Sequence, residues 1–432
     1  MSLLASVARI EPLVLLLASS ISSRSSVTQQ LLQDRLCLQV HHLPADTCRS
    51  LASPNGRIVD ITAREAVMSD VASYLSLKEL LSILPCLLLT AATAAWCDKY
   101  PNGRRLVILA SAVGHLLESV LLLLVSVSTS ADFRLILMSS LPSSVLGSGF
   151  MTALFSFLSV TTHAQDRSSR FLLISISFSI GFVAGSLFTG KLVDADPLVV
   201  IADDPRIQLH NCGDIILLDA CLCFVAGAWA AVCIPAVPVA LCDASLDDTS
   251  EDEEPIVSST DQDEAGETAT GIPEPDCMAR LWRQLTALCH PDSLLAVWRT
   301  GTRERDTRSL LWFCVAIHAL ILVPYYGYRV IGFPISERLY SWDTRSYAYA
   351  NAGITAVQQV IVTAYSLLIV KRLSLKPTTV VLIGSISSFL GLVLSGSFSQ
   401  CSCHDCGISP CIPRRDLVVG RQSFGLDSRA GK

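Results

Sequence analysis

The sequence is short of charge. Only 16% of its 432 residues are Asp, Glu, Lys or Arg, whereas a soluble domain carries about a quarter. Hydrophobic residues make up 51%, and the mean hydropathy is +0.50. A soluble globule of this length needs more polar surface, but a membrane protein does not, because lipid replaces water around it. The composition therefore predicts an all-α polytopic membrane protein whose main partner is the lipid bilayer.

The signatures of several function classes are also missing. The chain has no Walker loop, no ABC-transporter signature and no dinucleotide fingerprint. It has no basic footprint of the kind that binds nucleic acid, and no catalytic constellation. The cysteines in 401–432 do not have the spacing of a common zinc site. We therefore expect no enzyme activity, no cofactor, no metal site and no nucleic-acid partner, and any transport must draw on a gradient rather than on ATP.

Long apolar runs are abundant. A transmembrane helix needs about 20 mostly apolar residues, and eight stretches meet that requirement. A weaker ninth stretch, 9–30, contains Arg24 and many serines. The eight stretches are 72–97, 106–128, 133–160, 170–193, 215–241, 309–333, 347–370 and 376–399.

The charges in the links between spans predict the orientation. Basic residues gather in the links 98–105, 163–170 and 371–376, whereas the link 194–214 is mostly acidic. The positive-inside rule then places the N-terminus in the cytosol. The plasma membrane is the expected location, with an endolysosomal membrane as the alternative.

Three cysteines fall in links that this orientation places outside: Cys37, Cys48 and Cys212. Disulfides persist there, so one pair among the three is expected. The sequence does not decide which, and a bond from Cys48 to Cys212 is only a guess.

The spans fall into unequal groups. Six lie in 1–241, and an acidic linker with a candidate amphipathic helix occupies 242–308. Three further spans lie in 309–399, and a polar stretch with several cysteines follows in 400–432. Two six-helix halves joined by a long cytosolic linker are the layout of major facilitator transporters. With three spans fewer than that layout, we expect the chain to be a fragment, or to leave the family's path near residue 400.

A charged turn strengthens this resemblance. The stretch "AAWCDKYPNGRR" (94–105) resembles the major facilitator signature G-x-x-x-D-x-x-G-R-[RK]. Ala94 replaces the first Gly of that signature, and the spacing from Asp to Gly is two residues longer. The resemblance implies an ionic latch that helps to hold a cytosolic gate, and the alternative is a basic turn that only fixes topology. The matching residues are Asp98, Gly103, Arg104 and Arg105.

Three further segments are similar to solute carrier family 46. They are 9–37, which opens near a Glu-Pro pair, 163–194, which carries the Arg167 and Arg170 pair, and 333–353. The resemblance implies proton-coupled uptake of a small organic anion, such as folate or a related solute. The alternative is a truncated paralogue that does not transport and serves as a scaffold or associates with another membrane chain.

Ionisable groups inside the spans are the candidates for substrate binding or proton coupling, because their burial in lipid is costly. His115 and Glu118 share one face of the third span, and His318 lies within the seventh. For each of these, a hydrogen bond between helices is the alternative. Arg24 and Arg329 suit a carboxylate, but either could instead lie at the outer membrane interface.

Small residues predict close contacts between helices. Gly181 and Gly185 form a G-x-x-x-G pattern, and Gly147 and Gly149 form a second small-residue site. Helix packing is the simpler interpretation of all four, and sliding of helices past one another would need the same residues.

Overall fold

The computed structural model describes most of the first half of the chain and a shorter part of the second. The regular structure in these residues is entirely helical. They belong almost entirely to one compact unit, Met1–Ser366. Outside the described residues lie the predictions for 242–308 and 400–432, most of the span 376–399, and the predictions for His318 and Arg329. The described residues are 10–51, 61–100, 102–128, 131–163, 166–197, 209–235, 332–337, 342–365, 367, 384 and 386–387.

Five helical stretches in the described residues are long and apolar enough to cross a membrane, which makes this a multi-pass membrane bundle. They are Thr62–Ala94, Gly103–Val127, Arg134–Thr161, Ser169–Leu192 and Cys212–Cys233. The helices of the bundle are α2 (Glu11–Arg35), α3 (Ala45–Leu51), α4 (Ile61–Lys99), α5 (Gly103–Val127), α6 (Arg134–Met138), α7 (Leu141–Leu146), α8 (Phe150–Thr161), α9 (Arg167–Leu192), α10 (Cys212–Cys233) and α15 (Thr344–Ala364).

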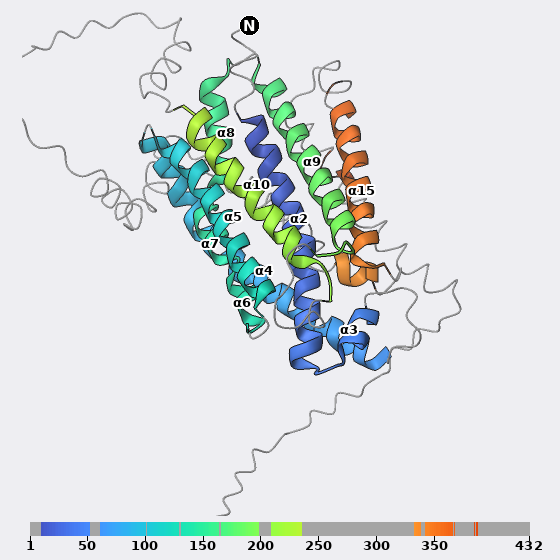
Figure 1. Ribbon diagram of the computed structural model, residues 1–432. Coiled ribbons are helices and arrows are strands. Elements are labelled where there is room, and N and C mark those ends of the chain that lie inside the picture. The colour runs from blue at the N-terminus through green and yellow to red at the C-terminus, as the bar shows by residue number, and fades with distance from the viewer. Residues whose placement is uncertain are drawn as a thin grey trace, which may run out of the picture. The chain divides into compact units, whose positions relative to one another are not determined.

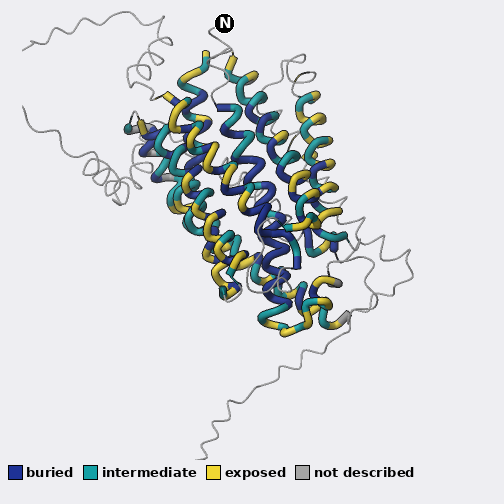
Figure 2. Tube along the Cα trace, viewed as in Figure 1, coloured by how far each residue is buried: buried dark blue, intermediate teal, exposed yellow. Residues whose placement is uncertain are grey.

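The least apolar of the long helices occupies the middle of the bundle. Helix α2 packs against α9 and α10, α10 packs against α5, and α15 packs against α9 (Figure 1). Of the 25 residues of α2, 19 are buried, including five of its serines and all three of its glutamines. In Figure 2 this helix is mostly dark blue, with some teal, beside neighbours whose outer faces carry yellow. Arg24 and the serines make 9–30 the weakest predicted span. The bundle accommodates these polar residues because the faces of this helix meet protein rather than lipid.

Close packing on α2 depends on the predicted glycine pair. A Cβ atom at Gly181 of α9 would collide with the backbone oxygen of Leu15, and one at Gly185 with that of Ser19. Both glycines therefore lie in close contact with the backbone of α2. Gly149 likewise lies against Thr93 of α4, and Gly147 lies close to Ser111 of α5.

The predicted span 133–160 is a broken helix. It consists of α6, α7 and α8, with interruptions at 139–140 and 147–149. Pro142 stands at the start of α7, where its missing N–H costs nothing, and glycines occupy the second interruption. The breaks bring short helices against both α4 and α5.

The other boundaries differ by several residues. Helix α4 begins at Ile61 rather than near 72, and α10 ends at Cys233 rather than near 241. The early start of α4 is a polar extension beyond the apolar run, which hydropathy does not detect.

The disulfide joins Cys37 to Cys48. The guessed bond from Cys48 to Cys212 is therefore wrong, because Cys212 is a buried free thiol at the start of α10. The bond closes the short link between the π-helical turn Leu36–Val40, which continues α2, and α3.

Candidate functional site: a buried ionic cluster

Four ionisable residues from three helices meet inside the bundle. They are Arg24 of α2, His115 and Glu118 of α5, and Asp219 of α10, and we call them the central cluster. The side chains of Arg24 and Glu118 are only 5% and 6% exposed, and that of Asp219 is fully buried. A charge at this depth is stable only when it is paired and hydrogen-bonded.

Arg24 supplies most of the pairing. Its Nη1 donates to Asp219 Oδ2 at 3.3 Å, to Ser119 Oγ at 3.1 Å and to the His115 carbonyl at 3.2 Å. Its Nε lies 3.5 Å from Glu118 Oε2. Hydroxyls of Ser20 and Ser119 donate to the two oxygens of Asp219. The guanidinium is thus held by groups from two other helices.

The remaining hydrogen bond of Arg24 determines which ring nitrogen of His115 carries the proton. Nη2 of Arg24 lies 2.8 Å from Nδ1 of His115. A guanidinium can only donate, so Nδ1 accepts and carries no proton in this arrangement. The ring then holds its single proton on Nε2. A second proton, on Nδ1, would point at the guanidinium and would have to turn toward Glu118 Oε2, which lies 3.8 Å away.

A polar cavity opens beside the central cluster. It has a volume of about 240 Å³ and is lined by Arg24, His115 and Glu118 together with Lys78 and serines of α2, α4 and α7. Lys78 Nζ lies 4.0 Å from Glu118 Oε1. Two cations, Arg24 and Lys78, therefore face two carboxylates, Glu118 and Asp219, and with a neutral His115 these charges sum to zero. Glu79 also lines this cavity.

The structure brings together three of the five predicted coupling candidates. Arg24, His115 and Glu118 meet, and the interpretation of Arg24 as an outer-interface residue is wrong, because its side chain lies deep between α5 and α10. Sequence reasoning missed Asp219 and Lys78. Asp219 had a usable signal, since it is an acid inside an apolar run.

A second, larger cavity of about 470 Å³ lies between α2, α9 and α15. Hydroxyl and amide side chains line it, among them Ser26, Asn351 and Gln358, with Phe178, Phe182 and Tyr347. Ser179 of α9 donates to Gln359 of α15 at 2.6 Å across it. Ser25 lines both this cavity and the one beside the central cluster. Both cavities therefore reach this serine of α2.

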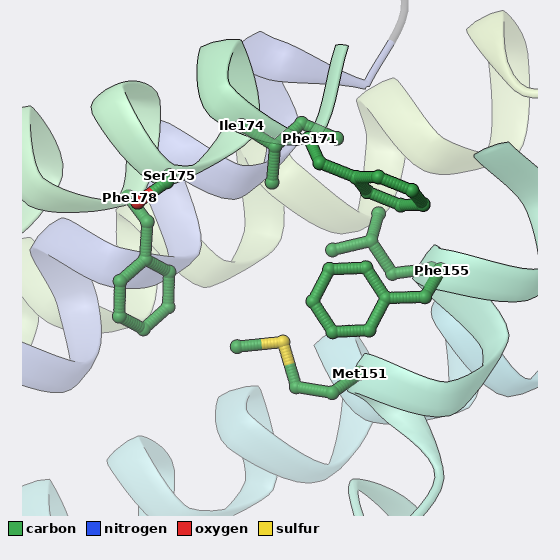
Figure 3. A pocket seen from close by; sticks show the side chains of 7 residues that line it. Met151, Phe155, Phe171, Ile174, Ser175 and Phe178 are labelled. Atoms are coloured by element: carbon green, nitrogen blue, oxygen red, sulfur yellow. The ribbon is translucent and has the colours of Figure 1, made fainter. Parts of the chain in front are cut away.

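A third hollow is of a different kind. Figure 3 shows Met151, Phe155, Phe171 and Phe178 around it, between α8 and α9, and Phe155 and Phe171 meet edge to face at 5.5 Å. Its volume is also about 470 Å³, but its lining is almost wholly apolar. Ser175 is the sole polar side chain among the described residues that line it, and none of them is charged, so we assign it no role in binding a charged solute.

The motif turn is compact. The Gly103 N–H donates to the Tyr100 carbonyl, and a Cβ at Gly103 would come within 2.8 Å of the Trp96 oxygen, so only glycine fits there. Arg104 donates to Ser156 of α8 at 2.8 Å, and Arg105 to the Ala231 carbonyl of α10 at 2.6 Å. The backbone of Asp98 lies in the last turn of α4, but its side chain lies outside the described part, so its predicted role as a latch stays a prediction.

The Arg167 and Arg170 pair stands at the start of α9. Arg167 donates to the Thr162 carbonyl at 3.2 Å, and Arg170 pairs with Glu11 of α2 at 3.2 Å. The basic residues described near this end of the bundle therefore fasten helix ends to one another.

A second polar group, which we call the end cluster, lies where α2 ends. It consists of Gln33, Asp34, Arg64, His210 and Glu337. His210 Nδ1 lies 3.0 Å from Asp34 Oδ2, and Arg64 Nη2 lies 3.6 Å from Glu337 Oε1. Burial by itself lowers the pKa of His210, but the neighbouring Asp34 carboxylate outweighs it, and the pKa is raised above its ordinary value.

No family model matches the chain, and no curated protein matches its sequence. The part of the chain described here holds no group of three or more His, Cys, Asp or Glu side chains that could bind a metal ion. The function must therefore be argued from the central cluster and its cavity.

Proposed function

We propose that the protein is a secondary active transporter that moves a small organic anion together with protons. The observation that carries the proposal is the charge balance of the central cluster beside a polar cavity inside a membrane bundle. An anion that enters this cavity adds a negative charge to a set whose two cations, Arg24 and Lys78, are already matched by carboxylates. The low dielectric makes that addition expensive unless a proton enters as well.

His115 is the group best placed to take that proton. An extra proton on Nδ1 breaks the bond from Arg24 Nη2 and turns the ring toward Glu118. Arg24 then has a free N–H pair, and Glu118 has a new partner. The guanidinium becomes available to a carboxylate in the cavity, for which its planar fork is well suited. Proton and anion binding thereby support each other.

The wider bundle supports the same function. Helix α15 lies against α9 and α2 and lines the larger cavity with amides and hydroxyls, which suit the uncharged part of a solute. In the major facilitator arrangement that the motif turn resembles, α15 belongs to a second half that rocks against the first. The disulfide between Cys37 and Cys48 favours an outside location for that end of α2, in agreement with a cytosolic N-terminus and with the plasma membrane as location.

The test is a binding and uptake assay on the full 432-residue chain. A panel of labelled organic anions, folate among them, is applied at pH 5.5 and 7.4 to the protein in liposomes and in detergent. We expect tighter binding and faster uptake at pH 5.5, and we expect His115→Gln to lose that pH dependence. Arg134→Gln, at a site 75% exposed, is the control and keeps it.

Two results would contradict the proposal. One is that no anion of the panel binds or enters at either pH. The other is that His115→Gln responds to pH as the parent does. The second result, with a stably folded protein, favours the alternative that the central cluster only ties helices together.

A further inference from the structure

Besides Glu118 and Asp219 of the central cluster, the carboxylate of Glu337 is also buried, near the C-terminal end of α2. Glu337 lies in the helical turn 332–337, and its side chain is only 3% exposed. Its Oε1 accepts from Gln33 Nε2 at 3.4 Å, and Arg64 Nη2 lies 3.6 Å from the same oxygen. Its Oε2 is buried and has no hydrogen-bond partner among the described residues. Half of this carboxylate is therefore unsatisfied, which is costly for an anion and much less so for a neutral acid.

The charges that face Glu337 do not compensate for this burial. Arg64 approaches from α4, but it is about a third exposed and also donates to the Glu337 backbone carbonyl, at 3.2 Å. Asp34 faces it from α2 with the same sign of charge, and Asp34 is itself paired with His210. Burial raises the pKa of Glu337 to about 7, an effect that Arg64 and Gln33 only partly offset and Asp34 reinforces.

We propose that Glu337 is a proton-binding site that docks the turn 332–337 onto α2 and α4 when the proton is bound. This inference goes beyond the transport proposal and does not depend on it. In the docked state the neutral acid leaves no uncompensated charge in the buried site. Loss of the proton leaves a buried anion with one distant cation, so the turn loosens.

The direction of the pH dependence follows from linkage. A carboxyl group in water has an ordinary pKa near 4.5, and docking raises the pKa of Glu337 to about 7. The docked state therefore holds the proton more tightly than the open state does. Docking is strongest below pH 4.5, weakens by up to tenfold per pH unit between pH 4.5 and about 7, and levels off at higher pH.

A series of contacts links the turn 332–337 to the wall of the larger cavity between α2, α9 and α15. The Trp342 N–H donates weakly, at 3.5 Å, to the Ser336 carbonyl in the turn, and Thr344, at the start of α15, donates to Gln30 of α2. Helix α15 then supplies Asn351 and Gln358 to the cavity wall. A loosened turn would free the end of the helix that lines this cavity.

The experiment follows exposure at Thr344, which is 4% exposed in the docked state. A Thr344→Cys chain in detergent is labelled with a water-soluble maleimide from pH 5.5 to 8.5, and labelling at 344 is read by peptide mass spectrometry. The same is done with Glu337→Gln, which mimics the bound proton. The ratio of the two rates cancels the thiol's own pH dependence. We expect the ratio of the parent's rate to that of Glu337→Gln to rise several-fold between pH 5.5 and about 7 and to change little above that pH.

Two further variants sharpen the test. Asp132→Asn removes an exposed carboxylate and must leave the rise intact. Arg64→Gln removes the facing cation that lowers the pKa of Glu337, so the rise should continue to a higher pH before it levels off. An unchanged rise in the Glu337→Gln background, or no rise in the parent, would overturn the proposal.

Discussion

The two polar clusters on α2 differ in how completely their charges are compensated. In the central cluster each carboxylate meets a cation or a hydroxyl, and the charges of Arg24, Lys78, Glu118 and Asp219 cancel. In the end cluster Glu337 keeps one oxygen without a partner. The comparison teaches that burial alone does not set the behaviour of an ionisable group. The central cluster should resist a change of charge, whereas the end cluster should titrate near neutral pH.

The largest expected effect comes from breaking the central cluster. Arg24→Gln leaves Glu118 and Asp219 buried without their main cation, and we expect it to cost about 3–5 kcal/mol of stability. The melting temperature and the folded yield in detergent measure this. Arg134→Gln is the control, because its exposed pair with Asp132 contributes little.

A charge-neutral rescue makes this prediction sharper. Arg24→Gln combined with Glu118→Gln and Asp219→Asn removes the uncompensated anions, so part of the lost stability should return. A triple variant as unstable as the single one would show that Arg24 acts through its packing rather than its charge.

The disulfide should matter at the other end of α2. Cys37→Ser with Cys48→Ser opens a loop with a sequence separation of 11, which we expect to cost about 2–3 kcal/mol. Hydrogen exchange should rise around α3 and the start of α4 and stay unchanged in α5 near His115. Cys86→Ser, at a free cysteine, is the control, and equal loss in both variants would contradict the prediction.

Packing around α2 should contribute somewhat less. Gly185→Ala places a methyl group against the Ser19 carbonyl, and we expect a loss of about 1–3 kcal/mol from overpacking. Gly353→Ala is a matched control in α15, since nothing lies within 4 Å of its added Cβ. It should leave stability unchanged or raise it slightly. Equal melting temperatures for the two variants would argue against close packing of α9 on α2.

The smallest effect concerns His210. Because Asp34 raises the pKa of His210, their ion pair is fully present below about pH 6.5 and is lost as the pH rises through the raised value. His210→Gln should therefore lower stability by about 1.5 kcal/mol at pH 6 and by less at pH 8, as followed by thermal melting. His41→Gln removes a more exposed pair with Asp70 and should change less at both pH values.

Much of the fold could be predicted from the sequence, because apolar length is a direct requirement of the bilayer. The five apolar helices all fall on predicted spans. Arg24, His115 and Glu118 could be singled out because charge is rare inside such spans. Their meeting could not be predicted, since it depends on which faces of α2, α5 and α10 turn toward each other. Lys78 was missed although it lies inside the predicted span 72–97, where a lysine is as usable a signal as Asp219.

The disulfide and the end cluster show a different limit. Cys37 and Cys48 are near each other in sequence, but the choice between Cys48 and Cys212 depends on where the link after α2 turns back. Glu337 looks like an ordinary loop acid in "FPISERL". Only the packing of its turn against α2 and α4 buries it.

The polarity of α2 has a consequence for biosynthesis. A helix with an arginine at its centre and many buried serines and glutamines gains little by leaving the translocation channel for lipid alone. The helices that cover it, α5, α9 and α10, emerge from the ribosome only later. We therefore expect α2 to wait at the channel, or beside an insertion chaperone, until its partners arrive. Nascent chains that stop before α10 should be recognised by quality control, while those that include it should not.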